Sequence, residues 1–129
     1  MKLAYVDSSC LVAIAFGEPG YEEVLKRLNL CERLFSSNLL EAELRAALAR
    51  EGEGDREGDL LSGITWIYPN RQLTAEYRRI LNAGTLKGAD LWHVACALFL
   101  SPEPKELAFL TLDRSQKTVA RALGFPSLE

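Results

Sequence analysis

The sequence is poor in the residues that build disulfide frameworks and zinc sites. Its 129 residues include three cysteines, Cys10, Cys31 and Cys96, and His93 is the only histidine. The cysteines are odd in number, widely spaced and without a Cys-x-x-Cys pair, so neither a disulfide scaffold nor a zinc site is expected. We expect all three to be buried thiols that pack as small apolar residues.

Long hydrophobic runs and an excess of positive charge are also missing. No apolar stretch approaches the roughly 20 residues that cross a bilayer, so no membrane span is expected. Asp7 interrupts the apolar segment from Leu3 to Ile14, which does not have the layout of a signal peptide, and we expect a cytoplasmic protein. The formal net charge of -3 argues against a broadly basic nucleic-acid binder, although local cations can still hold phosphates.

What the sequence does contain is an alternation of strand and helix patterns in a chain the size of one domain, 1–129, with 48% hydrophobic residues. This alternation predicts an α/β fold with a parallel sheet covered on both faces. Ser8 and Ser9 are available to cap the first helix, and Asn38 the third. The segment 51–59 is rich in glycine and charge and is predicted to be a loop or a mobile helix junction, and 125–128 could add an edge strand. Strands are predicted at 2–6, 34–37, 64–68 and 107–112, and helices at 10–16, 21–30, 39–50, 73–81, 90–100 and 115–123.

Four acidic residues, Asp7, Glu43, Asp90 and Asp113, lie inside or beside apolar segments. Burying a lone carboxylate costs several kcal/mol, so a protein keeps several together when a cation or a bound proton neutralises them. Asp7 and Asp113 follow predicted strands, and parallel sheets carry their sites at the carboxyl ends of the strands. If the fold gathers the four, they form a metal site. Asp7 could instead serve the turn after its strand, and Asp113 could cap the last helix with Gln116 completing a capping box.

The helix pattern separates Glu43 from its neighbour Glu41. At about 100° per residue, Glu43 lies on the side of the apolar positions and Glu41 lies about 160° away. Glu41 precedes Arg45 by four residues, which suits an exposed ion pair. We therefore assign Glu43 to the site and Glu41 to the surface.

Asp90 opens the most apolar helix of the chain, where a helix cap and a metal ligand are compatible roles. His93 lies one turn further on and could touch the site. A lone histidine on an apolar helix is more often a core residue with a local hydrogen bond, and we assign His93 to the core.

The motifs around these acids resemble those of the PIN domain, particularly the VapC-type ribonuclease toxins of toxin-antitoxin pairs. The resemblance runs from Lys2 to Phe125 and implies a three-layer α/β/α sandwich in which Asp7, Glu43, Asp90 and Asp113 bind Mg²⁺ or Mn²⁺. It also implies hydrolysis of RNA to a 5'-phosphate and a 3'-hydroxyl, a cognate antitoxin and a homodimer. The motifs are Tyr5-Val6-Asp7-Ser8-Ser9, Ala42-Glu43-Leu44-Arg45-Ala46, Gly88-Ala89-Asp90-Leu91-Trp92-His93-Val94-Ala95, Leu110-Thr111-Leu112-Asp113 and Leu123-Gly124-Phe125.

Further polar residues are candidates around such a site. Ser8 and Thr111 could hold metal-bound water, or serve respectively as a helix cap and an ordinary strand residue. Three cations of the last helix, spaced i, i+3 and i+7, could hold RNA phosphates or form a solvated face. These are Arg114, Lys117 and Arg121; Lys87 is a further candidate at the mouth of the site, and Arg78 and Arg79 are weaker ones.

Other functions fit the sequence less well. A haloacid-type phosphatase needs a second aspartate two residues after its nucleophile, where this chain has Ser9, and no Gly-rich phosphate loop or dinucleotide fingerprint is present. The alternative from another class is a PIN-like module that binds RNA or protein without cutting, but the presence of all four acids favours a nuclease. An antitoxin that delivers an Arg or Lys into the acidic site is a plausible inhibitor. Val24, Leu25 and Leu28 could form an interface or belong to the core.

Overall fold

The computed structural model describes residues 2–127, except for the side chains of Asp55 and Glu57, and is built around a four-stranded sheet. The strands are β1 (Leu3–Val6), β2 (Arg33–Ser37), β3 (Ile64–Ile67) and β4 (Ala108–Leu110). They lie in the order β3-β2-β1-β4, and every pairing is parallel. Strand β1 is therefore central, with Tyr5 in register with Phe35 on one side and Phe109 on the other.

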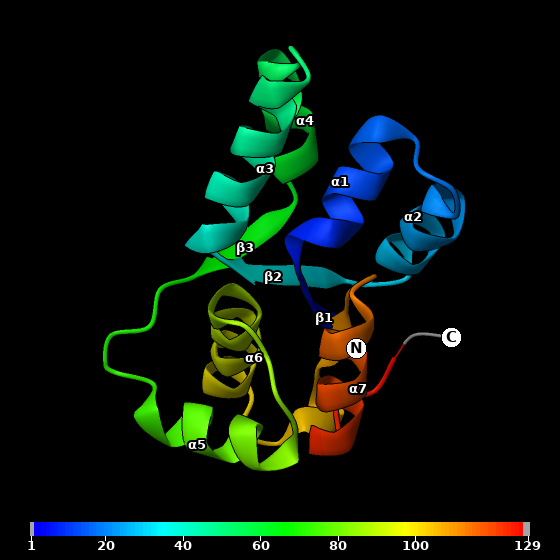
Figure 1. Cartoon of the computed structure of the whole chain (residues 1–129). Helices are drawn as coiled ribbons and strands as arrows, with labels where there is room; N and C mark the ends of the chain where they lie inside the picture. The colour runs from blue at the N-terminus through cyan, green and yellow to red at the C-terminus, as the bar shows by residue number, and fades with distance from the viewer. Residues whose placement is uncertain (1, 128–129) are drawn as a thin grey trace.

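Helices cover both faces of this sheet (Figure 1). Helices α1 (Ser8–Phe16), α2 (Tyr21–Asn29), α3 (Asn38–Arg50) and α4 (Glu57–Leu61) belong to one side. Helices α5 (Thr74–Ala83), α6 (Gly88–Leu100) and α7 (Arg114–Leu123) belong to the other. Two short 3₁₀ turns, η1 (Gly54–Arg56) and η2 (Pro104–Glu106), complete the described elements. The predicted α/β/α sandwich with a central parallel sheet is confirmed.

Alternation along the strands divides the core between the two faces. Tyr5 and Phe109 stack with their ring centroids 5.3 Å apart on the α6 side, whereas Ala4, Val6 and Leu110 pack toward α1 and α3. Such burial on both faces is typical of parallel strands. Across residues 2–127, no helix is both long enough and apolar enough to cross a membrane.

The cysteines follow the prediction only in part. Cys10 and Cys96 are buried free thiols, as expected, but Cys31 is half-buried. Cys31 follows the end of α2, where its thiol faces the carbonyl oxygen of Arg27 at 3.5 Å. That position at a helix end leaves one side of the thiol exposed.

The order of the strands creates a crevice at one end of the sheet. The chain steps from β1 to β2 to β3 in one direction and then crosses to β4 on the other side of β1. Parallel α/β sheets bind ligands outside the carboxyl ends of the strands where the chain reverses its direction in this way. Asp7 directly follows β1 and Asp113 lies three residues beyond β4, so both lie at this crevice.

Several local predictions were wrong at element boundaries. Asp7, rather than Ser8 or Ser9, caps α1, because its carboxylate accepts the Ser9 N–H. The N-cap of α3 is Ser37 and not Asn38. Helix α6 begins at Gly88, so Lys87 occupies the N-cap position and Asp90 lies in the first turn.

Two predicted irregular or extended segments also differ. The segment 51–59 holds η1 and the start of α4, where Leu61 is buried and Arg56 hydrogen-bonds to Glu53 and to the Ala15 carbonyl oxygen. No strand forms over 125–127, and residue 128 lies outside the described residues. The Phe125 side chain turns into the core beside Phe109, and proline at 126 lacks the N–H that a strand would need.

Gly84, at the end of α5, lies against α7. A Cβ at this position would come within 2.7 Å of the Val119 Cγ2 atom. We expect Gly84→Ala to lower the free energy of unfolding by about 1–3 kcal/mol, the usual cost of overpacking, as measured by urea denaturation. Gly63→Ala is the matched control because a Cβ there meets nothing within 4 Å; equal losses in the two variants would contradict the packing argument.

Candidate metal and nuclease site

Asp7 is the buried centre of the site, with only 4% of its surface exposed. Its Oδ1 accepts hydrogen bonds from the Ser9 N–H at 3.2 Å and from the Ser9 hydroxyl at 2.6 Å. Its Oδ2 accepts one from the Thr111 hydroxyl at 2.8 Å. The Leu112 N–H donates to Ser9 Oγ at 2.9 Å, so the segments after β1 and β4 are tied together around this carboxylate.

The environment of Asp7 works against its negative charge. Burial raises the pKa of Asp7 above its ordinary value, and the neighbouring charge of Glu43 adds to that rise. The hydrogen bonds from Ser9 and Thr111 and the proximity of His93 lower the pKa but offset only part of the effect. An ionised Asp7 therefore lacks full compensation from the protein itself.

Glu43 approaches Asp7 from α3 and is held by His93. Its Oε1 atom lies 2.7 Å from His93 Nε2, and its side chain is 31% exposed. Glu41, two residues earlier, forms the predicted ion pair with Arg45 at 2.8 Å on the solvent side. The predicted orientations of the two glutamates are confirmed.

His93 has a larger part in the site than the sequence indicated. It is buried as predicted, but its hydrogen bonds are not local: Nδ1 lies 2.7 Å from the Tyr5 hydroxyl oxygen and Nε2 faces Glu43. The sequence signal for this role was the position of His93 one helical turn after Asp90. The partners lie on β1 and α3, which only the tertiary structure brings to this ring.

Asp90 and Asp113 form the more open part of the site. With Lys87 and Ser115 they line a cavity of about 370 Å³. Burial raises the pKa of Asp90, and the charges of Asp113 and Glu43 raise it further, against the opposing effects of His93 and Lys87. The mutual repulsion of these carboxylates indicates that they share one electrostatic site.

Gln116 connects the two parts of the site, a role that the sequence analysis missed. Asp113 caps α7 by accepting the Gln116 N–H at 2.8 Å, as predicted. The Gln116 side chain does not complete a capping box; it is fully buried, with Oε1 2.8 Å from the Thr111 hydroxyl and Nε2 3.3 Å from the Asp90 carbonyl oxygen. The signal available in the sequence was spacing: Gln116 precedes Val119 and Ala120 by three and four residues, which places it on the apolar face of the helix.

A comparison with known families identifies the family to which this chain belongs. The family model described as PIN domain matches residues 4–122, which is most of the chain. The chain belongs to the PIN-domain family. PIN domains are generally nucleases, so the chain has a nuclease-type fold. No curated protein and no solved structure matched the chain significantly.

The four candidate acids have the chemistry, but not the arrangement, of a formed metal site. Within the described part of the chain, no three His, Cys, Asp or Glu side chains are arranged to hold one ion. Glu43 contacts His93 and its charge acts on Asp7, whereas Asp90 and Asp113 line the open cavity. The four candidate ligands are all carboxylates, which is the chemistry that Mg²⁺ and Mn²⁺ prefer. The raised pKa values of Asp7 and Asp90 indicate charge that a cation would neutralise, so the donor set fits.

The sequence also predicts water-holding hydroxyls and RNA-binding cations around the four acids. Ser8 begins α1 and is half-buried, while the hydroxyls that contact Asp7 belong to Ser9 and Thr111. A role for Ser8 or Thr111 in holding metal-bound water stays a prediction. The predicted RNA-binding cations are all exposed. Lys87 lines the cavity with Asp90. The other three lie along α7: Arg114, Lys117 and Arg121.

We expect Asp7→Asn to stabilise the metal-free protein. The amide removes a buried charge, keeps an acceptor for Ser9, and donates to Thr111, whose single hydroxyl proton is then available to Gln116. Measured with EDTA present, the melting temperature should rise by about 2–5 °C at neutral pH. A lower melting temperature in the variant would contradict the pKa argument.

The pH dependence has a definite sign. Because the folded-state pKa of Asp7 lies above the ordinary value of 3.8, the folded protein binds this proton more readily than the unfolded chain. The free energy of unfolding of the wild type therefore gains from this group as the pH falls from neutral toward that value. The stability difference between wild type and Asp7→Asn should narrow over the same range, as measured by urea denaturation at each pH.

Proposed function

We propose that this PIN domain is a metal-dependent endoribonuclease that acts in the cytosol as the VapC-type toxin of a type II toxin-antitoxin pair. The observation that supports the proposal is the position of Asp7 and Asp113 after β1 and β4, with the charges of neighbouring carboxylates acting on Asp7 and Asp90. The charge of Glu43 acts on both Asp7 and Asp90, and the charge of Asp113 acts on Asp90, so these acids lie within electrostatic reach of one another. Asp7 and Asp113 also cap helices, but capping does not need four carboxylates near one another, whereas a site that binds a cation does.

The four carboxylates would together hold Mg²⁺ or Mn²⁺. When bound, such an ion supplies an activated water and stabilises the charge that develops on a phosphodiester. Asp7 is fixed by Ser9 and Thr111, whereas Asp90 and Asp113 face the open cavity. Asp7 would therefore provide a buried ligand, and the two aspartates of the cavity would provide ligands that the substrate can reach.

The surface around the cavity supports RNA as the substrate class. Lys87 lines the cavity, and Arg114 is exposed at the start of α7 beside Asp113. Both cations are therefore accessible to phosphates of an RNA strand. A second, shallow cavity of about 410 Å³ between the start of α3 and α6 is lined in part by Asn38 and Trp92. A half-buried indole that lines a cavity could stack on an unpaired base, which would favour single-stranded or looped RNA.

An antitoxin and a second copy of the chain are the proposed protein partners. The acidic site favours an antitoxin that inserts an Arg or a Lys. On α2, Val24 and Leu28 are buried in the core, so they are not an interface, whereas Leu25 is 41% exposed and Leu30 beyond the helix is 49% exposed. These two leucines remain available for a protein contact.

Cleavage of a labelled, structured RNA pool tests the proposed activity. We expect the wild type to cut the pool with Mg²⁺ or Mn²⁺ but not with EDTA, and Asp7→Asn to lose at least about tenfold of the rate. The melting temperature of the variant shows that lost activity is not lost folding. RNA binding without metal-dependent cutting would instead favour the PIN-like binding module, and would contradict the nuclease.

The two glutamates of α3 give a matched pair of variants. Glu43→Gln should lower the cleavage rate at least about tenfold because it removes a proposed ligand while keeping the shape of the side chain. Glu41→Gln changes only an exposed ion pair with Arg45 and should leave the rate within about twofold. Equal losses in the two variants would overturn the assignment of Glu43.

A further inference from the structure

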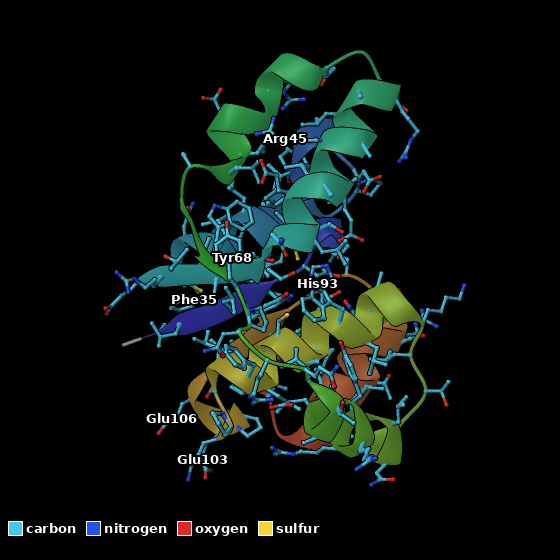
Figure 2. All side chains as sticks on the ribbon, turned by 90° about the vertical axis from the view of Figure 1, so that its left-hand side faces the viewer. Phe35, Arg45, Tyr68, His93, Glu103 and Glu106 are labelled. Carbon is cyan, nitrogen blue, oxygen red and sulfur yellow. The ribbon has the colours of Figure 1, made fainter. Side chains whose placement is uncertain are left out.

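A chain of polar groups runs from the middle of the sheet to Glu43. The Ser37 N–H donates to the Tyr5 hydroxyl oxygen at 3.2 Å, this oxygen lies 2.7 Å from His93 Nδ1, and His93 Nε2 lies 2.7 Å from Glu43 Oε1. Tyr5 is 0% exposed and His93 is 1% exposed, so water does not compete for the hydrogen bond between these two side chains. Figure 2 shows His93 where α6 meets the first turns of α3.

The hydrogen bonds have a single consistent direction when the imidazole is neutral. The Tyr5 oxygen already accepts the Ser37 N–H, and burial keeps the pKa of the phenol far above its ordinary value, so the hydroxyl retains its proton. That proton is available to His93 Nδ1, which leaves the ring hydrogen on Nε2 and directs it at the carboxylate. The opposite tautomer would place two lone pairs against each other, on Nε2 and Glu43 Oε1, at 2.7 Å.

We propose that Tyr5 and His93 are positioning residues: Tyr5 fixes His93 as the Nε2–H tautomer, and His93 in turn fixes the Glu43 carboxylate for the site. The part that concerns Glu43 rests on the proposed function, whereas the tautomer does not. In metal sites generally, a residue that hydrogen-bonds to a metal ligand sets the orientation of that ligand and the affinity of the site for the metal.

Packing alone does not account for these groups. The Tyr5 ring stacks on Phe109 at a centroid distance of 5.3 Å, and a phenylalanine would fill the same space. A buried hydroxyl and a buried imidazole carry a desolvation cost that an apolar core would avoid. Their hydrogen bonds lead out of the core to Glu43, a partly exposed glutamate and one of the four candidate acids. The imidazole therefore joins the core to the site through Glu43.

The first test reads the tautomer directly. Because the chain has a single histidine, a two-bond proton–nitrogen NMR correlation of the uniformly labelled, metal-free protein contains one imidazole. Over a pH series, the neutral ring of the wild type should show a protonated Nε2 and an unprotonated Nδ1. Tyr5→Phe should weaken this preference to a mixture of tautomers, and the control Tyr77→Phe, which removes a hydroxyl from the same core cluster, should not change it.

The second test measures Mn²⁺ affinity in the absence of RNA, by the paramagnetic resonance signal of free Mn²⁺. His93→Leu should weaken binding about tenfold or more, because Glu43 loses its donor. His93→Gln should restore affinity to within about threefold of wild type, because its amide nitrogen can donate from nearly the position of Nε2. Tyr5→Phe should weaken binding by a smaller factor, and Tyr77→Phe should bind as the wild type does.

The outcomes separate this inference from the proposed nuclease. A neutral ring protonated at Nδ1, or the same mixture of tautomers in wild type and Tyr5→Phe, would overturn the role of Tyr5 whatever the enzymatic result. Equal Mn²⁺ affinity in wild type and a folded His93→Leu would overturn the role of His93. If the wild type binds no Mn²⁺ and cuts no RNA while the ring is the Nε2–H tautomer, the nuclease proposal fails and the hydrogen-bond assignment stands. In RNA cleavage, a positioning role predicts a lower kcat with little change in KM for His93→Leu.

Discussion

The concentration of negative charge around the buried Asp7 is the constraint on which the site depends. The carboxylate has almost no access to water, and burial and Glu43 both raise its pKa. Hydrogen bonds from Ser9 and Thr111 stabilise the charged form without neutralising it. The strand order places this residue at the switch point of the sheet, so the fold maintains an unfavourable charge where parallel α/β proteins bind their ligands.

The site combines a buried part with an open part. Asp7 and Glu43 are each held by side chains that are themselves buried, Thr111 and His93. Asp90 and Asp113 line an open cavity, and Gln116 links the backbone around them to Thr111. This division suits a nuclease, since the buried groups set the geometry of the reaction while the open cavity gives the phosphate of the substrate access to it.

The same arrangement explains why polar groups occupy the core under α6. Tyr5 belongs to an aromatic cluster with Phe109 and Phe125, yet its hydroxyl is directed at His93 rather than left without a partner. This chain of hydrogen bonds extends from Tyr5 on β1 through His93 on α6 to Glu43 on α3, three elements that are distant in the sequence. A polar chain of this kind costs desolvation free energy, which hydrogen bonds to every member keep small.

Local patterns in the sequence determined the element types, the α/β/α class and the four acids as candidates. The spacing on α3 was enough to direct Glu43 inward and Glu41 outward, because helical geometry depends only on residues a few positions apart. The cap of α1, the turn at 54–56 and the course of 125–127 were missed, because long-range packing decided between local alternatives of similar energy.

The roles of His93, Ser9 and Gln116 were decided only by the tertiary structure. Each appears in the sequence as an ordinary polar residue of a helix, and each makes its decisive contact with an element from elsewhere in the chain: His93 with Tyr5, Ser9 with Leu112, Gln116 with Asp90. A local pattern fixes the face on which a side chain lies. It does not fix which partner meets that face, since the partner depends on how strands far apart in sequence pair and cross.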